Sequence, residues 1–172
     1  MDLTPEQELF ATKCATILSD PLLGRPIADD YSGINTVAKN IVATYEDLYE
    51  KYTKSGNPIS QDEHLYSFLY NQLYLIISDL SYSEKSENMD YRLKVLETVV
   101  SKNIDYGNSF DRNIEQFGMV AAFIRISDKS NRLDNLLKSD HTYVAESLLD
   151  TALDIAGYLT LTLVYLADNN LK

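Results

Sequence analysis

The feature that most constrains the fold is a nearly continuous apolar stretch close to the end of the sequence, AESLLDTALDIAGYLTLTLVYL. Its apolar residues fall on most sides of a helix, so the stretch predicts a central, buried helix from about Tyr143 to Ala167. Three acidic residues recur there at intervals of four and would form one stripe along the helix: Glu146, Asp150 and Asp154. Like charges at this spacing repel each other, more strongly where water is excluded. We therefore expect a cation, either basic side chains or a metal ion, to face the stripe.

The segment before this helix supplies basic side chains. Four charged residues at positions i, i+3, i+4 and i+7 share one helical arc beside an apolar arc: Arg125, Asp128, Lys129 and Arg132. The two helices could therefore face each other across a polar cleft at the edge of a helical core. The alternative, which the residues alone favour, is a solvated acidic face held by ordinary salt bridges.

Helical periodicity and capping signals run through the rest of the chain. Thr4, Pro5 and Gln7 have the pattern of a helix start, with Thr4 as the N-cap. The predicted helices before the last one span Pro5 to Leu18, about Ile34 to Lys54, about Ser60 to Ser81, Tyr91 to Val100, and Phe110 to Lys138, the last with Gly118 as a candidate interruption. A turn is expected over Ile104–Ser109, with Ser109 as a candidate N-cap. No segment alternates like a strand, so the sequence predicts an all-α bundle of about six helices.

Length and charge narrow the functional classes. A chain of 172 residues favours a single helical domain over residues 1–172. The net charge of −11 disfavours a nucleic-acid polymer or an anionic membrane surface as partner, because neither would be attracted. The lone cysteine, Cys14, is expected in the core and fits a reducing compartment. The sequence predicts no apolar run of transmembrane length, and its start is unlike a signal peptide, so a cytoplasmic location is expected.

Several common kinds of active site are absent from the sequence. Neither a GxxxxGK[ST] nor a GxGxxG motif occurs, which disfavours P-loop and Rossmann nucleotide binding. His64 and His141 are expected at the surface, because they lie among polar residues at helix starts and no zinc-ligand spacing includes them.

Three motifs of the C-terminal third follow one another in a specific order: KNIDYGNSF, RISDKSNRLDNLL and AESLLDTALDIAGYLTL. Over about Ser101 to Leu166 the chain resembles the nucleotide-modification-associated domain of the first type, a family of small helical proteins common in bacteriophages. Residues 1–100 match nothing comparable, so the family core is expected over residues 101–168. The resemblance implies a relationship to the all-α nucleotide pyrophosphatases of the MazG type. Those enzymes bind magnesium through helix-borne acids and cleave nucleoside triphosphates.

The resemblance also implies which residues form a site. The matched positions are Lys102, Asp105, Tyr106, Gly107 and Ser109 in the first motif, Arg125, Asp128, Lys129 and Arg132 in the second, and Glu146, Ser147, Asp150, Asp154 and Tyr158 in the third. Glu146, Asp150 and Asp154 would hold Mg²⁺, which prefers carboxylate oxygens and keeps water and phosphate as its other ligands. The basic residues would hold phosphate, and a tyrosine would stack on a base or bind a sugar hydroxyl.

One departure leaves three hypotheses open. The related enzymes carry a second acidic pair, ExxE, on an earlier helix, whereas the nearest candidates here, Glu46 and Glu50, are four residues apart. The first hypothesis is Mg²⁺-dependent nucleotide pyrophosphohydrolysis in the cleft between the last two long helices. The second is sequestration of an uncut nucleotide-derived immune signal of a host, as an anti-defence protein in the host cytoplasm. The third is a partner-binding bundle without a small ligand. A homo-oligomer is expected in each case.

Overall fold

The computed structural model describes residues 2–25, 63–83, 89–138 and 147–169, together with separate helical residues between 36 and 47. Within these ranges every regular element is an α-helix, which confirms the predicted all-α class. The helices are α1 (Pro5–Leu18), α3 (Glu63–Ser83), α4 (Tyr91–Tyr106), α5 (Ser109–Phe117), α6 (Val120–Lys138) and α7 (Leu148–Asp168).

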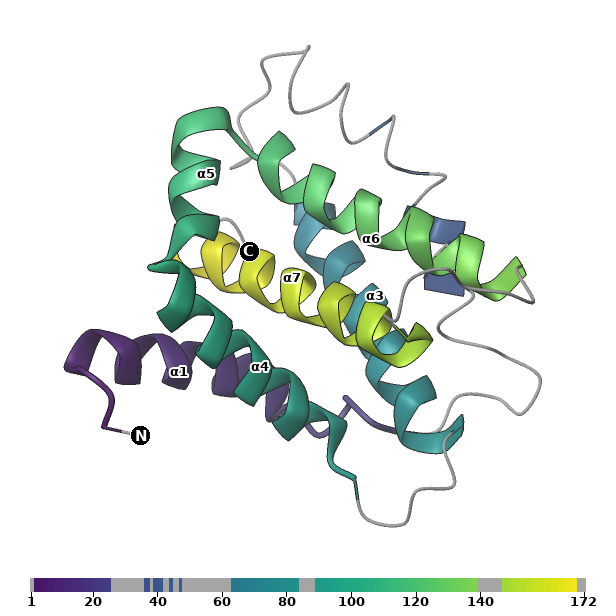
Figure 1. Ribbon diagram of the computed structural model, residues 1–172, viewed down its shortest axis with the longest axis horizontal. Coiled ribbons are helices and arrows are strands. Elements are labelled where there is room, and N and C mark those ends of the chain that lie inside the picture. The colour runs from purple at the N-terminus through teal and green to yellow at the C-terminus, as the bar shows by residue number, and fades with distance from the viewer. Residues whose placement is uncertain are drawn as a thin grey trace.

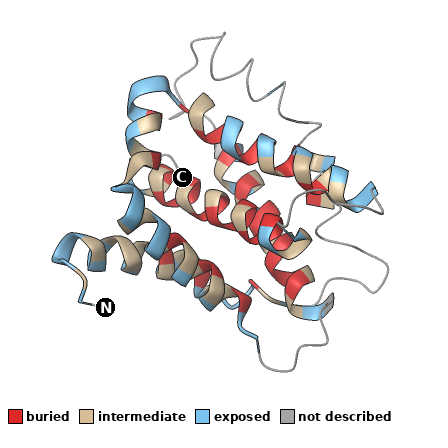
Figure 2. Cartoon of the chain, in the orientation of Figure 1, coloured by how far each residue is buried: buried red, intermediate tan, exposed pale blue. Residues whose placement is uncertain are grey.

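Helix α7 lies in the middle of the molecule, as predicted. In Figure 1 it runs between α6 on one side and α4 on the other, with α3 behind it, and α1 crosses beneath α4. Figure 2 shows buried residues along the length of α7, and residues such as Ile155, Leu159 and Leu163 are fully shielded from solvent. A helix that packs on several neighbours needs apolar residues on most of its sides, which is the pattern its sequence carries.

By length and composition alone, α7 could also cross a membrane. Its most apolar 18-residue window has a mean hydropathy of 1.3, so the judgement that no run reaches this length does not hold for α7. In the structure 61% of that window is buried against the protein itself. Residues that pack on other helices are not available to contact lipid, so α7 has the packing of a core helix.

The buried side chains form one hydrophobic cluster. It draws residues from each of the six named helices, and from Val37 and Ile41 in the partly described region. Cys14 is fully buried within it, as expected, and burial raises the pKa of its thiol to about 12. Helices α1 and α3, from the first hundred residues, pack against α7, so the two parts of the chain share a core.

Most helix ends follow from local capping. Thr4 caps α1 in a capping box with Gln7, and α1 has the predicted bounds. Gly118, with a φ of 77°, ends α5 and separates it from α6, which confirms the predicted interruption. Helix α4 is longer than predicted, because it continues past Val100 to Tyr106, where Gly107 adopts a left-handed conformation and ends the helix.

The predicted start of the last helix is wrong. The apolar periodicity suggested Tyr143, but α7 begins at Leu148, because Ser147 has an extended backbone and caps the helix. The Ser147 side chain accepts a hydrogen bond from the Asp150 backbone N–H, and the Asp150 carboxylate accepts one in return. The later start removes the reason to place Glu146 in register with Asp150 and Asp154. Glu146 itself lies outside the described residues, as do Glu46 and Glu50.

Candidate functional site

A pocket of about 450 Å³ opens where α4, α5, α6 and α7 meet. It mixes cationic, polar, aromatic and apolar side chains on four elements that are close in space and separated in sequence. Its lining residues are Thr98, Val99, Lys102, Asn103, Tyr106, Ser109, Phe110, Asn113, Arg125, Lys129, Leu153, Asp154, Gly157, Tyr158 and Leu161.

The centre of the pocket is an ion triad formed by Asp154 and two lysines. The Lys102 ammonium, from α4, lies 2.6 Å from Asp154 Oδ1, and the Lys129 ammonium, from α6, lies 2.9 Å from Asp154 Oδ2. Burial raises the pKa of Asp154, but the hydrogen bonds and charges of the two lysines outweigh it and hold that pKa below its ordinary value. Asp154 is therefore a carboxylate anion with both of its oxygens occupied by lysines.

The pocket has an excess of positive charge. Arg125 also lines it, and among the residues that the structure describes no carboxylate pairs with this guanidinium. Among the described lining residues, three cations thus accompany one carboxylate, in a protein whose overall net charge is −11. A local cationic site in an acidic protein attracts a small anion without attracting extended polyanions.

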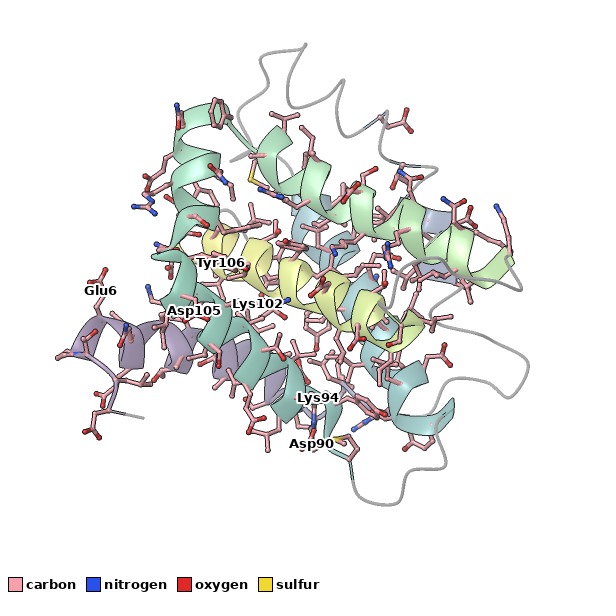
Figure 3. The ribbon with its side chains drawn as sticks, in the orientation of Figure 1. Glu6, Asp90, Lys94, Lys102, Asp105 and Tyr106 are labelled. Atoms are coloured by element: carbon pink, nitrogen blue, oxygen red, sulfur yellow. The ribbon has the colours of Figure 1, made fainter. Side chains whose placement is uncertain are left out.

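Aromatic side chains form the part of the pocket next to these charges. Phe110 of α5 and Tyr158 of α7 stack with their ring centroids 6.0 Å apart and their planes 23° from parallel. Tyr106, at the end of α4, is 66% exposed, so its ring faces are available to a ligand. Figure 3 labels Lys102 and Tyr106 along the edge of α4 that faces α7. Charged and aromatic groups on one wall suit a ligand with a phosphate and a flat ring.

A tight turn between α4 and α5 sets this wall. Gly107 and Asn108 both have positive φ angles, 57° and 55°, and their backbone N–H groups close the end of α4. The Asn108 side chain accepts a hydrogen bond from Asn103 and donates one to Asp111. The N-cap of α5 is therefore Asn108, and the prediction of Ser109 was wrong by one residue. Ser109 instead is the first residue of α5 and lines the pocket.

Close packing of α4 against α7 forms the floor of the pocket. Gly157 lies so near to α4 that a Cβ atom there would come within 3.2 Å of Val99 Cγ2. The absence of a side chain at Gly157 brings the two helices together and leaves room above them for the pocket.

Twelve of the matched positions, all except Gly107 and Ser147, were predicted to bind a ligand or a metal. The structure brings seven of them together in this pocket: Lys102, Tyr106, Ser109, Arg125, Lys129, Asp154 and Tyr158. Asp105 and Asp128 are exposed and do not line it. Arg132 lies farther along α6 and donates a hydrogen bond to the Thr151 hydroxyl over 3.4 Å. The cleft was predicted between the last two long helices alone, but α4 and α5 contribute to it as well.

The remaining two predicted residues, Asp150 and Glu146, belong to the proposed metal site. Asp150 is exposed and accepts hydrogen bonds from the Ser147 hydroxyl and backbone N–H, which lower the pKa of its carboxyl. Within the described ranges no three His, Cys, Asp or Glu residues are grouped closely enough to hold a metal ion. Since Asp154 is paired with lysines and Asp150 caps a helix, the described carboxylates do not fit a magnesium site as they stand.

Several lining residues were not predicted, chiefly Asn103, Phe110, Asn113 and Gly157. Asn103 lies one residue after Lys102 near the end of α4, but the helix was predicted to end at Val100, which left Asn103 outside it. Phe110 lines the pocket and stacks on Tyr158, a contact between two helices that no sequence motif indicates.

No protein-family model, no curated protein and no solved structure matches this chain. The pocket is therefore interpreted from its own chemistry.

Proposed function

We propose that this protein binds a nucleoside phosphate in the pocket between α4, α5, α6 and α7. The observation that carries the proposal is the composition of that pocket: Lys102, Lys129 and Arg125 outnumber Asp154, the one carboxylate among its described lining residues, and lie beside aromatic rings. Ammonium and guanidinium groups bind phosphate oxygens through charge-assisted hydrogen bonds. The exposed ring of Tyr106 offers a stacking surface for a base.

The size of the pocket supports a small molecule over a polymer. A volume of about 450 Å³ falls within the range of pockets that enclose small ligands. The net charge of −11 would repel a long nucleic acid, whereas one nucleotide meets mainly the local excess of positive charge. The polar side chains of Asn103, Ser109 and Asn113 provide donors and acceptors for a sugar or a base edge.

Holding the nucleotide intact is the form of this function that the side chains favour. Both oxygens of Asp154 pair with lysines, while Asp150 is exposed, lies outside the pocket lining and uses its Oδ2 in the cap of α7. A protein of this kind would sequester a nucleotide-derived signal, which is the anti-defence role expected from the resemblance to a phage-enriched family. Mg²⁺-dependent hydrolysis is the second candidate, and it requires carboxylates beyond the two described here.

The test is a thermal-shift screen of nucleotides and cyclic nucleotides, with and without Mg²⁺, followed by chromatography of the nucleotide recovered after denaturation. A ligand specific for the native state must raise the melting temperature. We expect a shift without Mg²⁺ and an unchanged nucleotide. A shift that needs Mg²⁺, with recovery of the monophosphate, would instead establish the hydrolase, and no shift with any nucleotide would refute both.

Matched arginine variants tie the shift to the pocket. Arg125→Gln removes a pocket cation and should reduce the shift. Arg92→Gln makes the same change on α4, outside the pocket lining, where Arg92 pairs with Asp90. The Arg92 variant should keep the wild-type shift.

A further inference from the structure

The role of Asp154 in the pocket is not explained by anion binding alone. A carboxylate between two phosphate-binding lysines opposes an anionic ligand, and among the described residues Asp154 belongs to no group of three or more potential metal ligands. Its position therefore needs an account that goes beyond the binding of a nucleotide.

We propose that Asp154 is a built-in competitor of the ligand: it occupies Lys102 and Lys129 in the empty pocket, and a ligand phosphate binds by taking at least one lysine from it. The inference deepens the proposed function and rests on it. In the empty pocket the Asp154 oxygens occupy the positions at which phosphate oxygens would accept hydrogen bonds from these lysines.

The geometry of the triad allows an exchange of partners. Each lysine contacts a different oxygen of the carboxylate, Lys102 on Oδ1 and Lys129 on Oδ2, so one pair can break while the other persists. The two lysines also come from different helices, α4 and α6, and so they are positioned independently of each other.

Burial indicates which lysine is exchanged. The Lys102 side chain is 52% exposed, whereas Lys129 is 21% exposed and Asp154 is 18% exposed. A half-exposed ammonium that leaves Asp154 can be solvated on its way to a phosphate, so its movement costs little. Lys129 and Asp154, which are more buried, would remain paired and keep the carboxylate compensated.

The competitor also sets specificity. Among the described lining residues, the Asp154 charge offsets one of three cations and so weakens the attraction of the pocket for anions. A more highly charged group, such as pyrophosphate, is repelled by Asp154 more strongly. Removal of the Asp154 charge should therefore increase the affinity for pyrophosphate more than the affinity for a phosphate of lower charge.

The test measures pyrophosphate binding by calorimetry in the presence of EDTA, so that no divalent metal takes part. Asp154→Asn keeps the size of the side chain and removes its charge, and it should tighten pyrophosphate binding about tenfold. The matched control is Asp168→Asn, which makes the same change on the same helix and breaks another inter-helix lysine pair, Lys13–Asp168, outside this pocket. The control should leave the affinity at the wild-type value.

The outcomes separate this inference from the proposed function. Tighter pyrophosphate binding by Asp154→Asn supports the competitor even if wild-type protein binds no nucleotide, in which case only the nucleotide proposal fails. Wild-type nucleotide binding with no tightening in a folded Asp154→Asn variant, as judged by circular dichroism, would overturn the competitor alone. Weaker binding in that variant would overturn it in favour of a role for Asp154 in holding the ligand.

Discussion

Two neighbouring turns of α7 carry the same residue type and use it in opposite ways. In the first turn, Asp150 is exposed and completes a capping box with Ser147. One turn later, Asp154 is largely buried and bridges two lysines from α4 and α6. The spacing of four residues made them look equivalent in the sequence. The difference teaches that periodicity assigns residues to a face, whereas the start of the helix and its neighbours assign them a role.

The largest effect is expected at the more buried of the two turns, where Asp154 lies, from the substitution Lys129→Met. Methionine keeps an unbranched chain and removes the ammonium that contacts Asp154 over 2.9 Å. Without Lys129, Lys102 becomes the only described lysine that compensates the largely buried Asp154 carboxylate. Its transfer to a phosphate then costs more, which should weaken nucleotide binding by about 2 kcal/mol, or about 30-fold. Calorimetry measures the effect, with Lys138→Met as the control, because Lys138 is an exposed residue of the same helix that pairs with Asp134. Equal affinities in the two variants would remove Lys129 from the site.

The second prediction concerns the capping turn, where Ser147→Ala should lower the free energy of unfolding by about 1 kcal/mol. Alanine can no longer accept the hydrogen bond from the Asp150 backbone N–H, which leaves a helix-terminal donor without its partner. Urea denaturation measures the change. Nucleotide affinity should stay at the wild-type value, since Ser147 does not line the pocket. A loss of affinity comparable to that of Lys129→Met would mean that the two turns are not functionally separate.

The third prediction uses pH to sharpen the contrast at Asp154. Burial raises the pKa of Asp154, but the two lysines outweigh this effect and hold the folded-state pKa below the ordinary value for an aspartate. The ion pairs therefore contribute stability that is fully present above the unfolded-state pKa and is lost as the pH falls through the lower folded-state value. Wild type should be more stable than Asp154→Asn near neutral pH, and the difference should shrink below about pH 4. Thermal unfolding across this range measures it, and a difference independent of pH would contradict the ion-pair account.

The sequence predicted the fold well where the signals were local or repeated. The capping box at Thr4, the interruption at Gly118 and the buried α7 are set by short patterns that tertiary contacts do not override. The start of α7 was missed because the helical pattern was extended back to Tyr143, whereas Ser147 caps the helix through its own hydrogen bonds and α7 begins at Leu148. The boundary of a helix can therefore depend on whether one side chain forms hydrogen bonds with the backbone.

The site was predictable only in part, for a related reason. The basic residues Lys102, Arg125 and Lys129 were identified from motifs, but the contribution of α5 depends on the turn at Gly107 and Asn108 and on the stacking of Phe110 on Tyr158. These contacts arise only when the chain is folded, and no periodic pattern in the sequence indicates them. The pairing of Asp154 with Lys102 likewise joins residues 52 positions apart, so no local pattern indicates it.

The smallest effect is expected for Asp150→Asn, and it tests the comparison most directly. Asparagine retains an oxygen that can accept the hydrogen bond from the Ser147 backbone N–H, so the cap should weaken slightly rather than disappear. Because Asp150 is exposed and outside the pocket lining, nucleotide affinity and the identity of the recovered nucleotide should not change. The magnesium hypothesis makes the opposite prediction, namely that this variant loses turnover while it stays folded. Chromatography of the recovered nucleotide distinguishes the two, because only a catalytic Asp150 would make the product disappear when it is replaced.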